Sequence, residues 1–370
     1  MSAQYEEVCA PAENARMTST TAIPTIVLGG SGYVAGEFLR LIAGHPELSL
    51  GGVVSTSQAG EPVGKTFPHL APTYPDTQFV SVDAVVERLN TAPRWLLLSA
   101  APHGASAQLI DQLLNAAASA GAELVVVDAS ADFRFADPAA YAAVYGHAHA
   151  TPARIKEFTC AVPEHLERIE TPHAAHPGCF ATTMLLAMVP LTALGVADEF
   201  YVSAVTGSTG AGRTPRDTTH HPLRQSNLFA YQALKHRHDP EVRALVKAST
   251  GRDVRLHFVP HSGPFARGIH ATIFLHAKER TTASQVNEAL REYYRGATFV
   301  RVDDEPPKMK DIAATNYAAL HAVADGDTIV VCSVSDNLLK GAAGGSVQWA
   351  NRLLGFPEST GLTAPAAGWL

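Results

Sequence analysis

Cysteine is scarce in this sequence of 370 residues, which has four, at positions 9, 160, 179 and 332. They lie far apart and include no C-x-x-C pair. This spacing argues against a zinc ribbon and against a disulfide framework, and we predict no metal site. A chain without disulfides suits a reducing compartment, so we expect a cytoplasmic location.

Long apolar runs and an excess of positive charge are also absent. The net charge is −7, which gives no basic field for nucleic acid or anionic lipid. No apolar run approaches the length that spans a membrane. Residues 1–22 lack the apolar segment of a signal peptide, and we expect residues 1–20 to be a disordered tail. The sequence therefore predicts a soluble protein that binds neither nucleic acid nor membrane.

What the sequence does contain is a glycine-rich segment between a strand and a helix. Residues 23–28 are an apolar run, residues 29–36 read GGSGYVAG, and residues 37–42 have a helical pattern. Glycines let a backbone approach a pyrophosphate, which then rests on the helix N-terminus. The segment predicts a dinucleotide site, against the alternative of a tight turn with no ligand. We assign the cofactor contacts to Gly29, Ser31, Gly32, Tyr33 and Val34.

The next predicted strand, Leu48 to Val54, ends in Ser55-Thr56-Ser57. An NAD-type fold places an acidic side chain here to hold the ribose hydroxyls, and these three residues include none. The hydroxyls of Ser55 and Ser57 can hydrogen-bond to a 2′-phosphate without repelling it, which favours NADP. The alternative is an ordinary polar loop.

Two further apolar strands end in polar turns. Residues 95–99 lead to Pro102-His103, and residues 124–127 lead to the segment 128–134. Parallel sheets bind ligands beyond the carboxyl ends of their strands, so we expect Pro102 and His103 close to the cofactor. Asp128, Asp132 and Arg134 are interpreted as a structural charge network beneath the site.

Cys179 stands at the predicted start of a helix. It follows the turn signal Pro177-Gly178 and precedes an apolar run that ends near Val189. Unpaired N–H groups and the helix dipole favour a thiolate there and can lower the pKa of the thiol. Cys179 is therefore the candidate nucleophile, against the alternative of a small buried hydrophobic residue.

Two histidines, His236 and His238, lie in the segment KHRHDPE at residues 235–241. Histidine has a pKa suited to moving a proton near neutral pH, and Glu241 can orient one of the two rings. Either ring beside Cys179 would form a thiol–base couple. The alternative is a surface turn.

Anion-binding candidates follow the later strands. A glycine-rich loop at residues 206–213 offers backbone N–H groups and one guanidinium to a substrate, and we assign this role to Ser208, Gly210 and Arg213. Arg267 is a second candidate, with an ordinary salt bridge as the alternative. Asn337 offers an amide complementary to a nicotinamide carboxamide.

These segments, in this order, resemble the family that holds N-acetyl-γ-glutamyl-phosphate reductase and aspartate-semialdehyde dehydrogenase, and the former in particular. The resemblance spans Ile23 to Leu362, and the joint order of the motifs makes it specific. Besides the glycine loop, they are FPHL at 67–70, PHG at 102–104, DASADFR at 128–134, PGC at 177–179, GAGR at 210–213, HRHDPE at 236–241, RGI at 267–269 and DNLLKGAAG at 336–344. Two positions depart from the family pattern: His176 stands where Asn is usual, and Gly345 where Gln is usual.

The resemblance implies a mechanism and an assembly. The thiolate of Cys179 attacks an acyl phosphate, phosphate leaves, and NADPH reduces the resulting thioester to an aldehyde. His236 or His238 moves the proton, with a slight preference for His238, and Arg213 and Arg267 bind the phosphate and carboxylate of the substrate. The implied reaction forms N-acetylglutamate semialdehyde in arginine biosynthesis, and a homodimer or homotetramer is expected.

We expect two domains. A Rossmann-type NADP-binding domain takes residues 21–178 and 337–370, and a mixed α+β domain for catalysis, substrate binding and oligomerisation takes residues 179–336. Related alternatives are reductases of carrier-linked glutamyl or aminoadipyl phosphate, or of aspartyl phosphate. Alternatives of other classes are a metal-dependent hydrolase, suggested by the pairs His147/His149 and His236/His238, and an NADP-binding sensor without catalysis.

Overall fold

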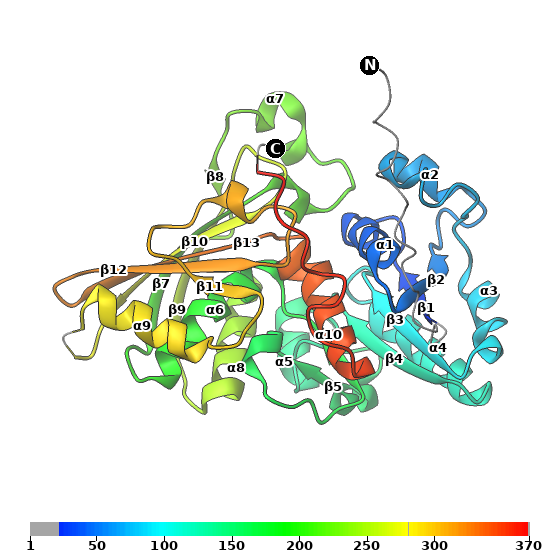
Figure 1. The fold of residues 1–370 in the computed structure, drawn as a ribbon, viewed down its shortest axis with the longest axis horizontal. Coiled ribbons are helices and arrows are strands. Elements are labelled where there is room, and N and C mark those ends of the chain that lie inside the picture. The colour runs from blue at the N-terminus through cyan, green and yellow to red at the C-terminus, as the bar shows by residue number, and fades with distance from the viewer. Residues whose placement is uncertain (1–21, 280, 369–370) are drawn as a thin grey trace, which may run out of the picture.

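The computed structural model describes residues 22–279 and 281–368, so the tail predicted for residues 1–20 lies outside the described residues. The described chain forms two β-sheets that lie side by side, each with helices packed against it (Figure 1). One sheet is wholly parallel and the other is mixed. The predicted class, a Rossmann-type domain with a mixed α+β domain, is confirmed.

The first sheet has six parallel strands in the order β2-β1-β3-β4-β6-β5. Its strands are β1 (Ile23–Leu28), β2 (Leu48–Val54), β3 (Arg94–Ser99), β4 (Glu123–Asp128), β5 (Phe158–Cys160) and β6 (His173–Ala175). The central strands are apolar along their length because helices cover both faces of a sheet of this kind.

Helices from both ends of the chain cover the first sheet. Helix α1 (Tyr33–Gly44) and the last helix, α10 (Gly344–Leu354), share one apolar core with alternate residues of β1 and β3, while α4 (Ser106–Ser119) packs on the opposite face. Four short helices lie in connections: α2 (Val63–Thr66), α3 (Val82–Val86), α5 (Pro138–Tyr145) and α7 (His221–Arg224). The C-terminal helix therefore returns to the N-terminal sheet.

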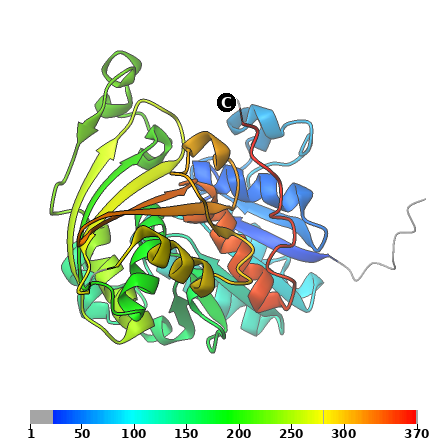
Figure 2. The same ribbon diagram turned by 60° about the vertical axis from the view of Figure 1, so that its left-hand side comes forward.

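The second sheet has seven strands in the order β11-β12-β13-β10-β7-β9-β8. They are β7 (Glu199–Thr206), β8 (Phe229–Ala230), β9 (Arg255–Ser262), β10 (Ile269–His276), β11 (Val300–Val302), β12 (Ala318–Asp325) and β13 (Thr328–Ser335). Helices α6 (Cys179–Ala193), α8 (His238–Thr250) and α9 (Ala283–Tyr293) gather on one face (Figures 1 and 2). Burial alternates along β7 and β10, as expected for a sheet with one covered face.

Helix α6 is the centre of the second core. Every side chain from Phe180 to Thr192 is buried, and a helix that is apolar on all sides must be enclosed on all sides. The chain reaches it from β6 through the short segment His176–Gly178, so the start of α6 stands where the two sheets meet. Within the described residues, no helix combines the length and apolar character needed to cross a membrane.

Candidate active site

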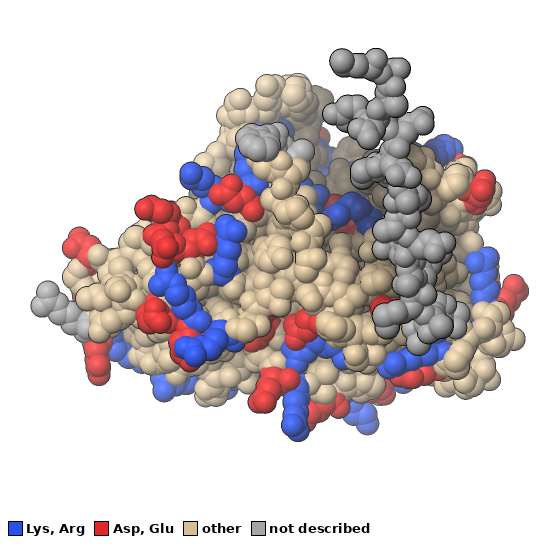
Figure 3. All heavy atoms as spheres, viewed as in Figure 1, with Lys and Arg blue, Asp and Glu red and all other residues tan. Residues whose placement is uncertain are grey.

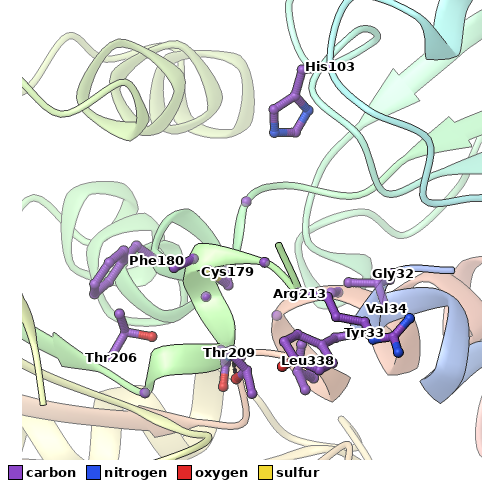
Figure 4. Close-up of a pocket in the computed structure, with 18 of the residues that line it drawn as sticks. Gly32, Tyr33, Val34, His103, Cys179, Phe180, Thr206, Thr209, Arg213 and Leu338 are labelled. Atoms are coloured by element: carbon purple, nitrogen blue, oxygen red, sulfur yellow. Dashed lines mark hydrogen bonds between the residues drawn. The ribbon is translucent and has the colours of Figure 1, made fainter. Parts of the chain in front are cut away.

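A cavity of about 720 Å³ opens where the two sheets meet. Its walls come from the start of α1, the segments after β3 and β4, the start of α6, the loop after β7, and the segments that lead into α8 and α10. Figure 4 shows Cys179 at the start of α6 on one side of it and Tyr33 and Val34 of α1 on another. The predicted nucleophile and the predicted cofactor loop therefore share one cavity.

Cys179 is the first residue of α6, and its pKa differs from the expectation. Burial raises the pKa of this thiol, and the opposing effects of Arg134, the N–H of Phe180 and Arg237 are smaller. The helix N-terminus acts in the predicted direction, but removal from water outweighs it. The thiol is therefore protonated at neutral pH in the free protein.

His238 lies beside the turn that precedes Cys179. A Cβ atom built on Gly178 would stand 2.3 Å from its Nε2, so the ring fills the space that the glycine leaves. Burial, followed by His236 and Arg134, holds the pKa of His238 well below its usual range. The ring is therefore a neutral imidazole that can accept a proton. Its backbone N–H donates to Nδ1 of His236, 3.2 Å away, which places both histidines at the cavity.

Glu241 does not orient a histidine, contrary to the expectation. Its Oε1 accepts the N–H of Gly178 at 2.6 Å, and its Oε2 pairs with Nη1 of Arg134 at 3.3 Å. Both side chains are buried, with exposed fractions of 0% for Glu241 and 6% for Arg134. The carboxylate thus fixes the backbone before Cys179 and holds a guanidinium at the cavity wall.

The polar residues after β3 and β4 divide into two groups. Asp128 and Asp132 accept hydrogen bonds from hydroxyls and backbone N–H groups beneath the cavity, as expected of a structural network. Pro102 and His103 line the cavity, and Nδ1 of His103 accepts the N–H of Ala131 at 3.0 Å. Burial, Arg134 and Arg237 lower the pKa of His103 to about 3, so its ring is neutral.

The glycine loop has the geometry that a phosphate-binding turn requires. Gly29 has a φ of +76°, and a Cβ there would lie 2.5 Å from the carbonyl oxygen of Ala100. Helix α1 begins after Gly32 with no side-chain cap, so the N–H groups of its first turn have no side-chain partner from the cap position. Gly32, Tyr33 and Val34 line the cavity, whereas Gly29 and Ser31 are not part of its wall. Ser55 is buried, and Ser55 and Ser57 lie outside this cavity.

The two arginines predicted to bind substrate lie in different places, because Arg213 lines the cavity and Arg267 does not. Arg213 donates to the carbonyls of Ser31 and Thr66, each at 3.3 Å, and therefore lies against the glycine loop (Figure 4). Arg267 contacts both carboxylate oxygens of Asp336, at 2.7 and 3.0 Å, and one of Glu37 at 2.8 Å. Arg267 is not part of the cavity wall, so its geometry favours the salt-bridge alternative.

Asn337, Ser208 and Gly210 join the loops around the cavity. Oδ1 of Asn337 accepts the N–H of Gly268 at 2.7 Å, and its Nδ2 donates to Thr209 at 3.0 Å. Asn337 and Gly210 line the cavity, whereas Ser208 is not part of its wall and donates its N–H to the carbonyl of Phe265. The amide of Asn337 is thus already used in holding two loops together.

Sequence reasoning missed several cations of this cavity. Arg216 and Arg237 line it, as does Arg134, and no Asp or Glu side chain of the described chain does. Neither Arg216 nor Arg237 forms an ion pair with any residue that the structure describes. Arg134 and Arg237 stand in the motifs DASADFR and HRHDPE, but no local pattern gives these arginines or Arg216 a place at the cavity, because only the fold brings the loop after β7 and the start of α8 together. The excess of unpaired positive charge suits anionic ligands.

The two H-x-H pairs do not gather into a metal site. Among the described residues no group of three or more His, Cys, Asp or Glu side chains could hold a metal ion. His149 uses both ring nitrogens on the backbone, with Nε2 donating to the carbonyl of Asp132 and Nδ1 accepting the N–H of Thr151. His147 contacts the carbonyl of Ala148.

Comparisons with known proteins agree with this architecture. Residues 25–158 match the family model described as semialdehyde dehydrogenase, NAD binding domain, and residues 179–337 match that described as semialdehyde dehydrogenase, dimerisation domain. A protein of Methanopyrus kandleri named N-acetyl-gamma-glutamyl-phosphate reductase is 37% identical over 345 residues, which are 92% of this chain and 97% of that protein.

Solved structures of two aspartate semialdehyde dehydrogenases have a fold similar to that of this chain. Aspartate semialdehyde dehydrogenase II from Vibrio cholerae has a TM-score of 0.64 at 15% identity, with 90% of this chain and 99% of that chain covered. Aspartate semialdehyde dehydrogenase with NADP from Candida albicans has a TM-score of 0.61 at the same identity and coverage. The chain therefore belongs to the N-acetyl-γ-glutamyl-phosphate reductase family and is an oxidoreductase of the semialdehyde dehydrogenase type.

Proposed function

We propose that this enzyme uses NADPH to reduce N-acetyl-γ-glutamyl phosphate to N-acetylglutamate semialdehyde and phosphate, a step of arginine biosynthesis. The observation that carries the proposal is the meeting of Cys179, His238 and the start of α1 at one cavity. The name of the Methanopyrus kandleri relative supports the choice of substrate. The same proposal includes two domains: an NADP-binding domain of residues 21–178 and 337–370, and a catalytic and oligomerisation domain of residues 179–336.

In this mechanism Cys179 and His238 begin as a neutral thiol and a neutral imidazole. His238 takes the thiol proton as the sulfur attacks the acyl carbon, and the bond to the phosphate oxygen breaks, which leaves a thioester on Cys179. Burial makes a separate thiolate costly before the substrate is bound, so proton transfer coincides with attack. His238 returns the proton to sulfur when the aldehyde leaves.

The cofactor site fits a nicotinamide dinucleotide with phosphate groups. The uncapped first turn of α1 offers N–H groups to a pyrophosphate, and Gly29 and Gly32 keep side chains out of the loop. When bound, the cofactor supplies the hydride that reduces the thioester carbon. We assign NADP rather than NAD because Ser55 and Ser57, just outside the cavity wall, bring hydroxyls and no negative charge, and because Arg213 of the wall adds a guanidinium beside the glycine loop. The Candida albicans structure is one with NADP.

The substrate is anionic at its phosphate and its carboxylate. Arg216 and Arg237 line the cavity without an acidic partner among the described residues, so they are our candidates for these groups. Arg134 is held by Glu241 and shapes the wall beside Cys179. Arg267 supports the fold around Asp336 instead of binding substrate.

We further propose a cytoplasmic homodimer or homotetramer that assembles through the uncovered face of the second sheet. One row across four strands of this face is Tyr201, Phe274, Val330 and Val323. Tyr201, Phe274 and Val323 are 45%, 43% and 45% exposed. The match to a dimerisation domain over residues 179–337 supports this choice.

The face of the molecule in Figure 3 carries positive and negative side chains that are interspersed. A mixed surface of this kind does not favour binding of a polyanion on that face.

The direct test runs the reaction in reverse. Purified enzyme is given N-acetylglutamate semialdehyde, inorganic phosphate and NADP, and formation of NADPH is followed by absorbance. Aspartate semialdehyde serves as the comparison substrate. We expect phosphate-dependent turnover with the first aldehyde and at least tenfold less with the second.

The Cys179→Ser variant tests the covalent route. It is expected to bind NADP as the wild type does and to lose turnover by about 10³-fold or more. Activity retained in that variant would contradict the thioester. Cofactor binding with no turnover in the wild type would instead favour the sensor, and turnover only on a carrier-linked acyl phosphate would favour the related reductases.

A further inference from the structure

His176 is a buried residue that neither the proposed chemistry nor the fold class explains. Its exposed fraction is 0%, and it lies in the short segment between β6 and Cys179. Its backbone N–H donates to the carbonyl of Asp128 at 2.8 Å, and its carbonyl accepts Nε of Arg134 at 3.1 Å. The backbone of His176 is therefore fixed by the last residue of β4 and by Arg134 in the segment that follows β4.

The imidazole of His176 reaches a third segment. Its Nε2 lies 2.9 Å from the carbonyl oxygen of Lys340, in the π-helical turn Leu339–Ala343 that precedes α10. A carbonyl oxygen only accepts, so Nε2 carries the proton and Nδ1 does not. Nδ1 is buried and has no hydrogen-bond partner among the described residues. The ring therefore makes its contacts through Nε2, which donates to the carbonyl of Lys340 at 2.9 Å and lies farther, at 3.3 Å, from Oγ1 of Thr182.

The turn held by that bond packs directly on Cys179. A Cβ atom on Gly341, the residue after Lys340, would lie 2.8 Å from Cβ of Cys179 and 2.9 Å from its Cα. Gly341 and Ala342 also line the cavity. A shift of the Lys340 carbonyl would therefore move the surface against which the reactive thiol rests.

Gly345 leaves the room in which the ring sits. A Cβ atom at this position would stand 2.1 Å from Cε1 of His176, 2.5 Å from Nε2 and 2.8 Å from Nδ1. Any side chain at 345 must expel the imidazole or displace α10. His176 and Gly345 therefore face each other and form a complementary pair.

We propose that His176 is a positioning residue for Cys179: its imidazole holds the carbonyl of Lys340, and thus Gly341, against the thiol, and Gly345 is required to admit the ring. This rests on the proposed role of Cys179 as nucleophile. His176 itself touches no reacting atom in this proposal.

The test is a double-mutant cycle with His176→Asn, Gly345→Gln and the double variant. In His176→Asn the shorter side chain cannot form the hydrogen bond to the carbonyl of Lys340, and in Gly345→Gln the new side chain expels the imidazole. Each single variant should therefore lose roughly 10- to 100-fold in kcat. In the double variant the Gln amide enters the vacated space and can donate to the same carbonyl. We expect its kcat within about threefold of the wild type, which is strong non-additivity between neighbours.

A second readout does not depend on turnover. The rate of Cys179 alkylation by iodoacetamide is followed by mass spectrometry of its peptide, with NADPH affinity and urea unfolding measured on each variant. We expect the alkylation rate to change in both single variants and to return in the double variant, while NADPH affinity stays constant. Gly44→Ala is the matched control, because a Cβ at Gly44 meets nothing within 4 Å.

The outcomes separate the two proposals. Single variants that match the wild type, or a double variant whose loss is the product of the two single losses, would overturn the positioning role of His176. Activity retained in Cys179→Ser would overturn the thioester route alone. The alkylation rate would still test the role of His176, because it reports the environment of the thiol without catalytic turnover. If Gly345→Gln does not fold, His176→Asn and the double variant still decide the question.

Discussion

The glycine loop and the region around the thiol are built in different ways. The loop, residues 29–34, is a continuous piece of chain whose shape follows from glycines at set positions, as the positive φ of Gly29 shows. The thiol corner, which we define as His176–Cys179 with Arg134, His238 and Glu241, is assembled from three separate segments. The loop is a local structure, and the corner is a tertiary one.

This difference decides how each region holds its ligand groups. The loop offers backbone N–H groups, which need no side-chain charge and little tertiary support. The corner holds a thiol, an imidazole and a buried ion pair away from water, and each of them must be compensated by a neighbour. Damage to the corner should therefore cost more stability than damage to the loop.

Loss of Glu241 should have the largest effect. Glu241→Ala leaves the buried guanidinium of Arg134 and the N–H of Gly178 without their partner. Breaking a buried pair on one side costs about 3–5 kcal/mol, so we expect the free energy of unfolding in urea to fall by about that amount. Activity should fall with it, since the turn before Cys179 loses its anchor.

The matched control is Glu288→Ala. Glu288 pairs with Arg291 on the surface at 3.7 Å, with side chains 73% and 38% exposed. Its loss should cost less than about 0.5 kcal/mol. Equal losses in the two variants would remove the distinction between the corner and an ordinary surface pair.

The sequence predicts the local structure well and the tertiary pairings poorly. The strand, glycine turn and helix at residues 23–44 are read directly from period and turn residues, and the helix start at Cys179 from Pro177-Gly178. The partners of Glu241 lie 63 and 107 residues away, and Arg267 meets Glu37 across 230 residues. No local pattern marks such pairings, so the sequence alone favours a histidine as the partner of Glu241 and leaves Arg267 open between a substrate ligand and a salt bridge.

The same limit applies to the pKa of Cys179. Its position at a helix start is visible in the sequence and argues for a thiolate, whereas the burial that outweighs it depends on the packing of both sheets. Free enzyme should therefore show an alkylation rate at Cys179 that rises about tenfold per pH unit from pH 6 to pH 8, or roughly 100-fold in all, since the thiol titrates above this range.

Peptide mass spectrometry follows this labelling at Cys179 alone, which excludes the other three cysteines, Cys9, Cys160 and Cys332, from the measurement. A thiolate paired with a charged imidazole would instead give a rate that is already high at pH 6 and nearly flat. That result would mean that the corner stabilises an ion pair in the free enzyme, and His238 would then begin the reaction protonated.

Within the glycine loop, Gly29 and Gly32 should respond differently to alanine. Gly29→Ala places a side chain at a φ of +76° and 2.5 Å from a carbonyl oxygen, so we expect a loss of about 1–2 kcal/mol in urea unfolding. At Gly32 a Cβ would meet only the carbonyl of Gly29, at 3.8 Å, and the loss should stay below about 0.5 kcal/mol. Equal losses would show that the loop needs flexibility in general, not one left-handed residue.

The last prediction is of an effect on binding instead of stability, and it concerns Arg213, where the loop and the rest of the enzyme meet. Its guanidinium comes from the segment after β7 and rests on the carbonyls of Ser31 and Thr66, with Phe67 beneath it at 5.7 Å. A charge-assisted bond to a cofactor phosphate is worth about 1.5 kcal/mol or more, so Arg213→Ala should raise the KM for NADPH by about tenfold and leave the KM for the acyl phosphate unchanged. Arg237→Ala should do the reverse, because Arg237 lies directly between His236 and His238 and lines the cavity with them. If Arg213→Ala raised the KM for the acyl phosphate instead, the substrate role predicted from the sequence would be correct, and the contact with the glycine loop would be only structural.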